Sequence, residues 1–179
     1  MRWGAGAAKQ KEVSVFEGGE VSEPLRSGPS EIDPAWIDYN GHLNMAYYLV
    51  LFDRGIDSLM ARVGLVPRAD GDATLFAAET QLRYLSELRQ DARVVCHTTV
   101  LRVDGKRLHT WQEVRDRDGP VAATCENLHL CVRRTVEGPR VGTFPAEVRP
   151  ALDGLVHRGP WPEGAGSPVA RRGFGAPGS

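Results

Sequence analysis

The chain has 179 residues, of which 41% are hydrophobic and 25% are charged, and these proportions are usual for one globular domain with its own core. Its formal net charge of −1, from 22 basic and 23 acidic side chains, excludes a general nucleic-acid-binding protein, which needs a net basic surface. The 3 cysteines are an odd number without C-x-x-C spacing, which excludes a disulfide scaffold and a zinc ribbon. We therefore expect free thiols and a cytoplasmic protein without a metal.

The two ends of the chain differ in composition from the segment between them. Residues 1–20 are small, polar and Gly-rich without a sustained period, which predicts a flexible arm and no secretory signal. Residues 158–179 are rich in Gly, Pro and Arg, which predicts a disordered tail. The folded domain is therefore expected over residues 21–157. Its longest apolar run, residues 45–52, is too short to cross a membrane.

A helix is predicted from Met45 to Val63, where apolar residues recur at i, i+3, i+4 and i+7. The first half of this segment is apolar nearly all round, which is typical of a helix buried on most sides. Asn44 is a suitable N-cap because its side-chain oxygen accepts a hydrogen bond from a free N–H group of the first turn. Gly64 fits the left-handed position that ends a helix. The sequence therefore predicts both ends of this helix.

β-strand patterns dominate the rest of the domain. A first strand within Pro24–Trp36 is predicted for an edge of the sheet, because its prolines cannot donate hydrogen bonds to a neighbouring strand. Further strands, two of them followed by Asp-Gly turns, are predicted at Thr74–Tyr84, Arg93–Val103, Lys106–Arg115 and Pro120–Arg134. Beyond Glu137 the prolines predict an irregular course, with a short docking turn at Leu152–Val156. One helix followed by an antiparallel sheet of about five strands is an α+β domain.

The polar segment just before the predicted helix is Asp38-Tyr39-Asn40-Gly41-His42-Leu43-Asn44. Asn40-Gly41 favours a turn because both residues tolerate positive φ. The free N–H groups and the positive dipole end of the helix would then face the polar side chains of this segment. Such an arrangement is suited to hydrolysis, because a carboxylate activates the nucleophile and the N–H groups stabilise an oxyanion.

This segment resembles the signature of the hotdog-fold acyl-CoA thioesterases of the 4-hydroxybenzoyl-CoA thioesterase type. The residues that fit the signature are Asp38, Gly41, His42, Leu43, Asn44, Tyr48 and Asp53. The runs Trp36–Asn44, Arg83–Leu85 and Lys106–His109 are similar to runs in the thioesterase domain attached to carnitine dehydrogenases. The resemblance implies a hotdog fold, in which a curved antiparallel sheet wraps one long central helix. It also implies hydrolysis of an acyl-CoA to a carboxylate and the CoA thiol, without a cofactor.

The resemblance also implies roles for individual residues. Asp38 takes the position of the catalytic carboxylate, as a general base or as a nucleophile that forms an anhydride, and the sequence leaves both open. The other expected site residues are His42 and Asn44 beside the carboxylate, Gly41 and Leu43 through their backbone, and Tyr39, Asn40, Tyr47, Arg83 and Arg107 against the acyl-CoA substrate. Family members assemble as homodimers or homotetramers and build each site from two subunits. The likeness to carnitine-linked domains fits a quaternary ammonium held by aromatic side chains through cation–π attraction.

Several of these residues also have a plainer explanation. An aspartate before Asn-Gly, such as Asp38, is commonly a turn residue. Some hotdog thioesterases carry the catalytic acid on the helix, which is where Asp53 falls. An ion pair of Asp53 with Arg54 or Arg83 is nevertheless the favoured interpretation. Cys125, His129 and Cys131 share one face of a predicted strand, but their spacing is not that of a zinc site.

Two other functions fit parts of the pattern. A hotdog enoyl-CoA hydratase has a proline and one more residue between its Asp and His, and the run from Asp38 to His42 lacks both. A non-catalytic acyl-CoA-binding module would keep the pocket and not need Asp38. An assay with acyl-CoAs separates the three functions. Thiol release indicates a thioesterase, water addition indicates a hydratase, and binding without turnover indicates a binding module.

Overall fold

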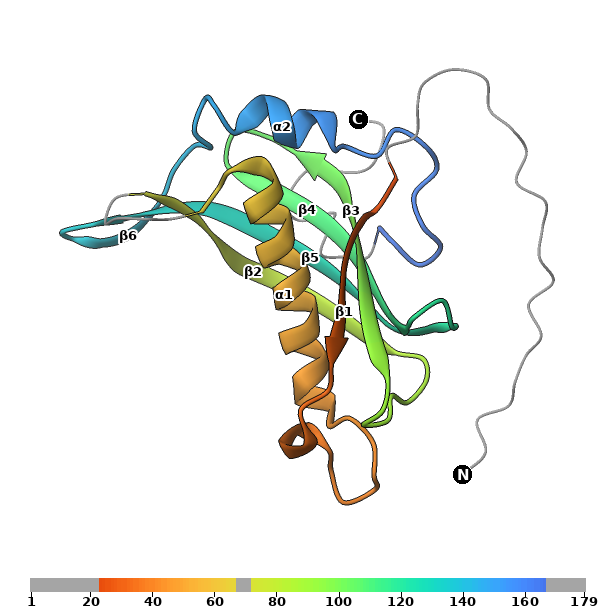
Figure 1. The fold of residues 1–179 in the computed structure, drawn as a ribbon. Helices are drawn as coiled ribbons and strands as arrows, with labels where there is room; N and C mark the ends of the chain where they lie inside the picture. The colour runs from red at the N-terminus through yellow and green to blue at the C-terminus, as the bar shows by residue number, and fades with distance from the viewer. Residues whose placement is uncertain (1–22, 67–71, 167–179) are drawn as a thin grey trace.

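A computed structural model describes residues 23–66 and 72–166, and it contains one long helix and one antiparallel sheet (Figure 1). The helix is α1 (Met45–Val63), preceded by the short 3-10 helix η1 (Pro34–Trp36). The strands are β1 (Leu25–Glu31), β2 (Ala73–Tyr84), β3 (Arg93–Val103), β4 (Arg107–Asp116), β5 (Val121–Thr135) and β6 (Gly138–Val141), and α2 (Arg149–Gly154) follows them. The strand order is β1-β3-β4-β5-β2, with β6 paired to β5, and α1 lies across one face. The expected α+β hotdog architecture is confirmed.

The ends of α1 are those that the sequence predicts. The side chain of Asn44 accepts a hydrogen bond from the N–H of Ala46 at 3.0 Å, and this caps the helix start. Gly64 ends the helix in the left-handed conformation with φ 77°, where its N–H reaches the carbonyl oxygens of Met60 and Ala61. In the middle of α1, a Cβ on Gly55 would lie 2.6 Å from Nε2 of Gln112. Glycine therefore lets the helix lie this close to the sheet.

The core lies between α1 and the central strands. One cluster near the helix start includes Leu51, Phe52 and Val114, and a second near the helix end includes Leu59 and Leu108. Burial of these side chains is the main stabilising contribution to such a layered fold. α1 contacts β1, β3 and β4. The flank of the sheet formed by β5 and β2 is thus left less covered by the helix.

The strands agree with the sequence, with one addition. β2 to β5 begin and end within one residue of the predicted positions, and β1 occupies the expected edge next to β3. The sheet has six strands where about five were expected, because Gly138–Val141 forms β6 against the end of β5. The exposed Pro139 and the absence of an alternating pattern hid this strand. The docking turn expected near Leu152 is α2, whose Leu152 is buried.

The segment after α2 corrects the expected boundary at residue 158. The N–H of His157 donates to the carbonyl of Val100 at 2.8 Å, and the chain then crosses the face of the sheet opposite α1. Trp161 lies edge-on against His109, with 5.5 Å between ring centroids. The N–H of Gly166 donates to Oε1 of Glu126 at 3.2 Å. Residues 158–166 are therefore docked, and the rest of the predicted tail and arm lie outside the described residues.

Candidate active site

The loop before α1 closes on itself and on the β2–β3 connection. Ile37 and Leu43 form an antiparallel bridge, and the N–H of Asp38 donates to the carbonyl of His42 at 2.9 Å. Gly41 has a φ of 79°, which agrees with the turn predicted at Asn40-Gly41. The N–H of Leu43 donates to the carbonyl of Leu88 at 2.8 Å. The loop that carries Asp38 is thus held by short backbone bonds within itself and to the β2–β3 connection.

The carboxylate of Asp38 is oriented by the turn that follows it. Its Oδ1 accepts a hydrogen bond from the N–H of Asn40 at 2.8 Å and lies 3.5 Å from the N–H of His42. The side-chain amide of Asn40 lies 3.5 Å from Oδ2. The plainer explanation, a turn aspartate, therefore applies. The residue is only half-buried, so the carboxylate remains accessible to a water molecule or a substrate.

The start of α1 offers one free backbone donor. In the described part of the chain, no acceptor is found for the N–H of Met45, whereas Ala46 is capped by Asn44. The backbone donors that the sequence led us to expect are already engaged. The N–H of Gly41 donates to the carbonyl of Asp38 at 3.0 Å, and the N–H of Leu43 donates to the carbonyl of Leu88. Sequence spacing did not reveal that these two groups close the loop. An oxyanion at this end of the helix would therefore meet Met45.

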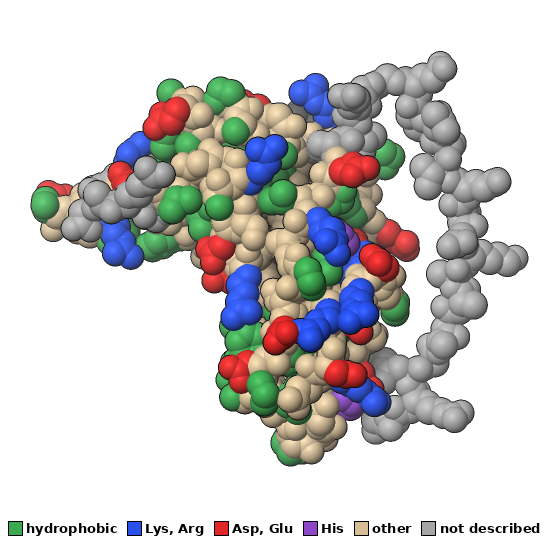
Figure 2. All heavy atoms as spheres, in the orientation of Figure 1, with side chains coloured by type: hydrophobic (Ala, Val, Ile, Leu, Met, Phe, Trp, Pro, Cys, Tyr) green, Lys and Arg blue, Asp and Glu red, His purple; other side chains and the backbone are tan. Residues whose placement is uncertain are grey.

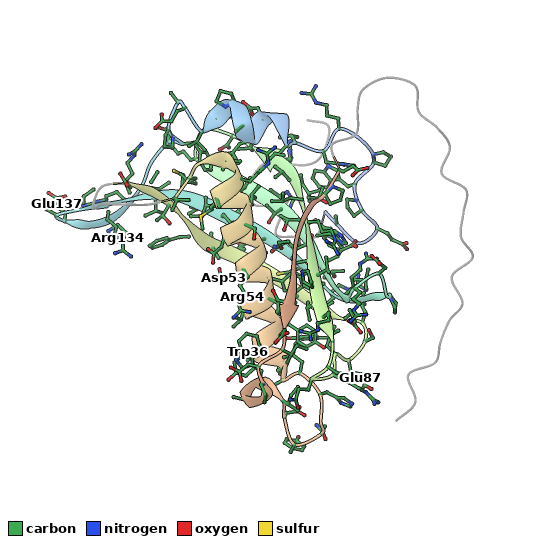
Figure 3. The ribbon with its side chains drawn as sticks, viewed as in Figure 1. Trp36, Asp53, Arg54, Glu87, Arg134 and Glu137 are labelled. Atoms are coloured by element: carbon green, nitrogen blue, oxygen red, sulfur yellow. The ribbon has the colours of Figure 1, made fainter. Side chains whose placement is uncertain are left out.

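His42 has a partner that sequence reasoning missed. Its Nε2 lies 3.1 Å from Oε2 of Glu87, and the other carboxylate oxygen, Oε1, lies 3.7 Å from Nη2 of Arg89. Glu87 lies in the bend between β2 and β3, near the start of α1 (Figure 3). Tyr48 holds this bend, since its hydroxyl donates to the carbonyl of Ser86 and accepts from the N–H of Leu88. His42 is thus positioned by a carboxylate more than 40 residues away in the chain.

The expected aromatic residues do not form an open cage. The rings of Trp36 and Tyr47 are stacked with centroids 5.0 Å apart, and the guanidinium of Arg54 lies 4.9 Å from the Trp36 centroid. Arg54 and Trp36 lie near each other by the first half of α1 (Figure 3). Tyr39 is 97% exposed at the tip of the loop. The cation–π position at Trp36 is therefore taken by a residue of the protein itself.

The two expected phosphate-binding arginines lie apart from the loop of Asp38. Arg107 begins β4 and pairs with Asp104 in the β3–β4 turn, at the end of the sheet where β3 finishes. The loop contacts Leu88 at the opposite end, just before β3 starts. Arg83 lies near Gly164, on the face of the sheet opposite α1. The single chain does not bring these arginines to Asp38.

A cavity of about 360 Å³ lies between α1 and the flank formed by β2 and β5. Its lining residues are Leu49, Val50, Phe52, Asp53 and Ile56 from α1, Ala77 and Thr80 from β2, Gln112 from β4, and Cys125, Asn127 and His129 from β5. Burial raises the pKa of the Cys125 thiol to about 12, and burial together with the nearby His109 lowers the pKa of His129 to about 4. Both groups are therefore neutral near pH 7. Asp53 brings a carboxylate to this cavity.

No metal site is evident in the described residues. In residues 23–66 and 72–166, no three His, Cys, Asp or Glu side chains are placed to bind one ion. Cys125 and Cys131 are buried free thiols, and His129 lines the cavity with Cys125. Within the same ranges, no helix is long and apolar enough to span a membrane.

Comparison with known proteins agrees with this fold. The model of the thioesterase-like superfamily matches residues 32–152, and the chain belongs to that superfamily. It is thus an acyl-CoA thioesterase of the hotdog type, as the signature around Asp38 indicates. It is 37% identical over 152 residues to the betainyl-CoA thioesterase of Pseudomonas aeruginosa, which covers 82% of this chain and 94% of that protein.

A second group of relatives is longer. The L-carnitine dehydrogenase/betainyl-CoA thioesterase of Agrobacterium fabrum is 32% identical, over 93% of this chain and 36% of that protein. The chain therefore spans about a third of these bifunctional relatives. Among solved structures, a Pseudomonas aeruginosa protein superposes with a TM-score of 0.68 at 20% identity, covering 78% of this chain and 96% of that one. A Staphylococcus aureus protein in complex with CoA superposes with a TM-score of 0.64 at 20% identity, covering 82% of this chain and 94% of that one. These likenesses support the fold.

Proposed function

We propose that the protein hydrolyses a CoA thioester of a small cationic acyl group, of which betainyl is the example in its relatives. The observation that carries this proposal is the 37% identity to a betainyl-CoA thioesterase over 94% of that protein. The bifunctional relatives carry the same name for part of their activity. The site geometry adds an oriented carboxylate and a free helix N–H, which are the parts that thioester hydrolysis requires.

In the proposed reaction, Asp38 acts on the thioester carbonyl beside the start of α1. As a general base it removes a proton from water, which attacks the carbonyl carbon; as a nucleophile it attacks that carbon itself and water later cleaves the anhydride. In both routes the carbonyl oxygen becomes an oxyanion, which the N–H of Met45 and the helix dipole stabilise. The oxyanion then collapses, the C–S bond breaks, and the departing sulfur takes up a proton, from Asp38 in the first route and from water in the second. The turn bonds of Asp38 orient its carboxylate for either route.

His42 and Asn44 support this site from either side of the loop. Asn44 fixes the start of α1 through its cap, and this holds the N–H of Met45 in place. His42, paired with Glu87, ties the loop to the β2–β3 bend. We place the activity in the cytoplasm, where reduced thiols persist, because the cysteines of the described residues are all free.

The test of the proposed function is a thiol-release assay over a panel of CoA thioesters. We expect the full chain to release CoA from betainyl-CoA and to leave crotonyl-CoA without added water across its double bond. Hydration of crotonyl-CoA would select a hydratase instead. Tight binding of betainyl-CoA without thiol release would select a binding module.

We also propose that the protein is a homodimer or a dimer of dimers. In the described chain, β2 is an edge strand of 12 residues with one unpaired side, and its Phe76 and Tyr84 are 42% and 46% exposed. Leu49 of α1 is 45% exposed beside the cavity that β2 also lines. Figure 2 shows this face of the molecule, on which hydrophobic side chains lie among charged ones. A second copy would cover both the strand edge and this apolar surface.

Light scattering at micromolar concentration tests the assembly, and a mass of two or four chains is expected. Phe76→Glu places a charge on the exposed side of β2 and should shift the mass toward one chain. Val136→Glu is the matched control, because Val136 is fully exposed in the β5–β6 turn, outside β2. A monomer mass for the unaltered protein would contradict the proposal.

A further inference from the structure

We propose that Asp53 is the residue that recognises the positive charge of the acyl group, and that the cavity between α1 and the β2–β5 flank holds a quaternary ammonium. This inference rests on the proposed function, since it names the residue that sets its substrate class. It goes beyond that function because the thioester chemistry requires Asp38 and the helix start, and neither needs Asp53. Asp53 therefore sets specificity, and it does not carry the bond cleavage.

The charge of the cavity favours a cation. Of the described side chains that line it, Asp53 is the one carboxylate, and burial favours the neutral forms of His129 and Cys125. The cavity therefore presents a carboxylate beside walls that are mostly apolar. A neutral aliphatic acyl group would contact the apolar walls but leave the Asp53 carboxylate beside it without a partner. A cationic acyl group satisfies both features.

Asp53 lacks a cation in the structure. Among residues 23–66 and 72–166, no Lys, Arg or His lies within salt-bridge distance of its carboxylate. Arg54 is next to it on α1 and turns toward the ring of Trp36 (Figure 3). The favoured ion pairs with Arg54 or Arg83 are thus not formed. Burial raises the pKa of Asp57, and the negative charge of Asp53 raises it further, so a cation at Asp53 would relieve this repulsion.

The rest of the cavity suits a cation that has no N–H groups to donate. The polar side chains of its floor already bond to one another: Thr80 donates to Oδ1 of Asn127 at 2.7 Å, and Asn127 donates to Oε1 of Gln112 at 3.1 Å. The amide of Gln112 in turn donates to the carbonyl of Phe52 at 2.9 Å. Leu49, Val50 and Ile56 offer apolar contacts. A trimethylammonium group needs apolar contact and a nearby negative charge, and this cavity supplies both.

A pair of substrates that differ only in charge tests the proposal. Betainyl-CoA and 3,3-dimethylbutanoyl-CoA have the same shape, since a carbon atom replaces the quaternary nitrogen. We expect the unaltered protein to show a kcat/KM for betainyl-CoA at least about tenfold above that for the neutral analogue. Asp53→Asn keeps the volume of the side chain and removes its charge. It should abolish this preference by lowering kcat/KM for betainyl-CoA about tenfold, with little change for the neutral analogue.

Asp57→Asn is the matched control, because it makes the same change one turn further along α1, outside the cavity lining. It should leave the preference within about threefold of the unaltered protein, since charges farther from the ligand are screened. An equal loss in Asp57→Asn would overturn the assignment to Asp53. So would an unaltered protein that hydrolyses both thioesters equally, or an Asp53→Asn variant that loses both activities together. Failure of the unaltered protein to release thiol from either substrate would instead contradict the proposed thioesterase activity.

Discussion

Replacing Asp38 with Asn is expected to lower kcat for betainyl-CoA by at least about a hundredfold while KM changes little, because removing a positioned base or nucleophile commonly costs about 10²–10⁴-fold. The amide keeps the shape of the side chain and an oxygen that accepts the N–H of Asn40. The turn should therefore survive, and the melting temperature should stay within a few degrees of its original value. Steady-state thiol release, together with a thermal melt, measures both quantities.

The comparison with Asp53→Asn makes this result decisive. With 3,3-dimethylbutanoyl-CoA, which has no charge for Asp53 to recognise, Asp38→Asn should still lose at least about a hundredfold in kcat and Asp53→Asn should lose little. If Asp53→Asn abolishes turnover of this neutral substrate and Asp38→Asn preserves it, the helix-borne acid is the catalyst. If neither change matters, the catalytic site lies elsewhere.

The parts of the fold that were predictable are those fixed by local chemistry. Asn44 caps α1 with its own side chain and Gly64 ends it through its own φ, so both ends of the helix follow from nearby residues. β2 to β5 follow from alternating or β-branched runs between turn residues. β6 pairs with the adjacent end of β5 but shows no alternating pattern, and the docked segment 158–166 depends on partners far away in the chain. Neither carries a local pattern, and both were missed.

In the site, too, the features set by nearby residues were predicted and those set by distant residues were missed. The turn at Asn40-Gly41 and the carboxylate before it are local, and the sequence predicted both. The partner of His42 was missed because Glu87 reaches the loop only after β2 has crossed the sheet. The environment of Asp53 was missed for a related reason, because the neighbouring Arg54 suggests an ion pair and instead contacts Trp36. Long-range packing determines which charged side chains form pairs, and the spacing of residues along the chain does not predict it.

Deleting residues 159–179 is expected to lower the melting temperature by about 5–10 °C, which corresponds to about 2–3 kcal/mol of stability for a chain of this size. The deletion removes Trp161, which covers His109, and the N–H of Gly166, which donates to Glu126. His109 and Glu126 are 0% and 1% exposed, with Nε2 and Oε1 2.7 Å apart, on the face of the sheet opposite α1. Uncovering this pair lets water compete for its hydrogen bond and exposes the apolar surface around it.

A chain that ends at Gly166 is the control for this deletion. It keeps every contact of residues 158–166 that the structure describes, and we expect it to melt within about 1–2 °C of the full chain. Trp161→Ala in the full chain should reproduce part of the fall in melting temperature, because Trp161 is half-buried and its ring contacts His109. Equal melting temperatures for the two truncated chains would mean that residues 159–166 add nothing to stability, as the Gly, Pro and Arg composition of this end predicts. A loss confined to the shorter chain would locate the stabilisation in the contacts of Trp161 and Gly166.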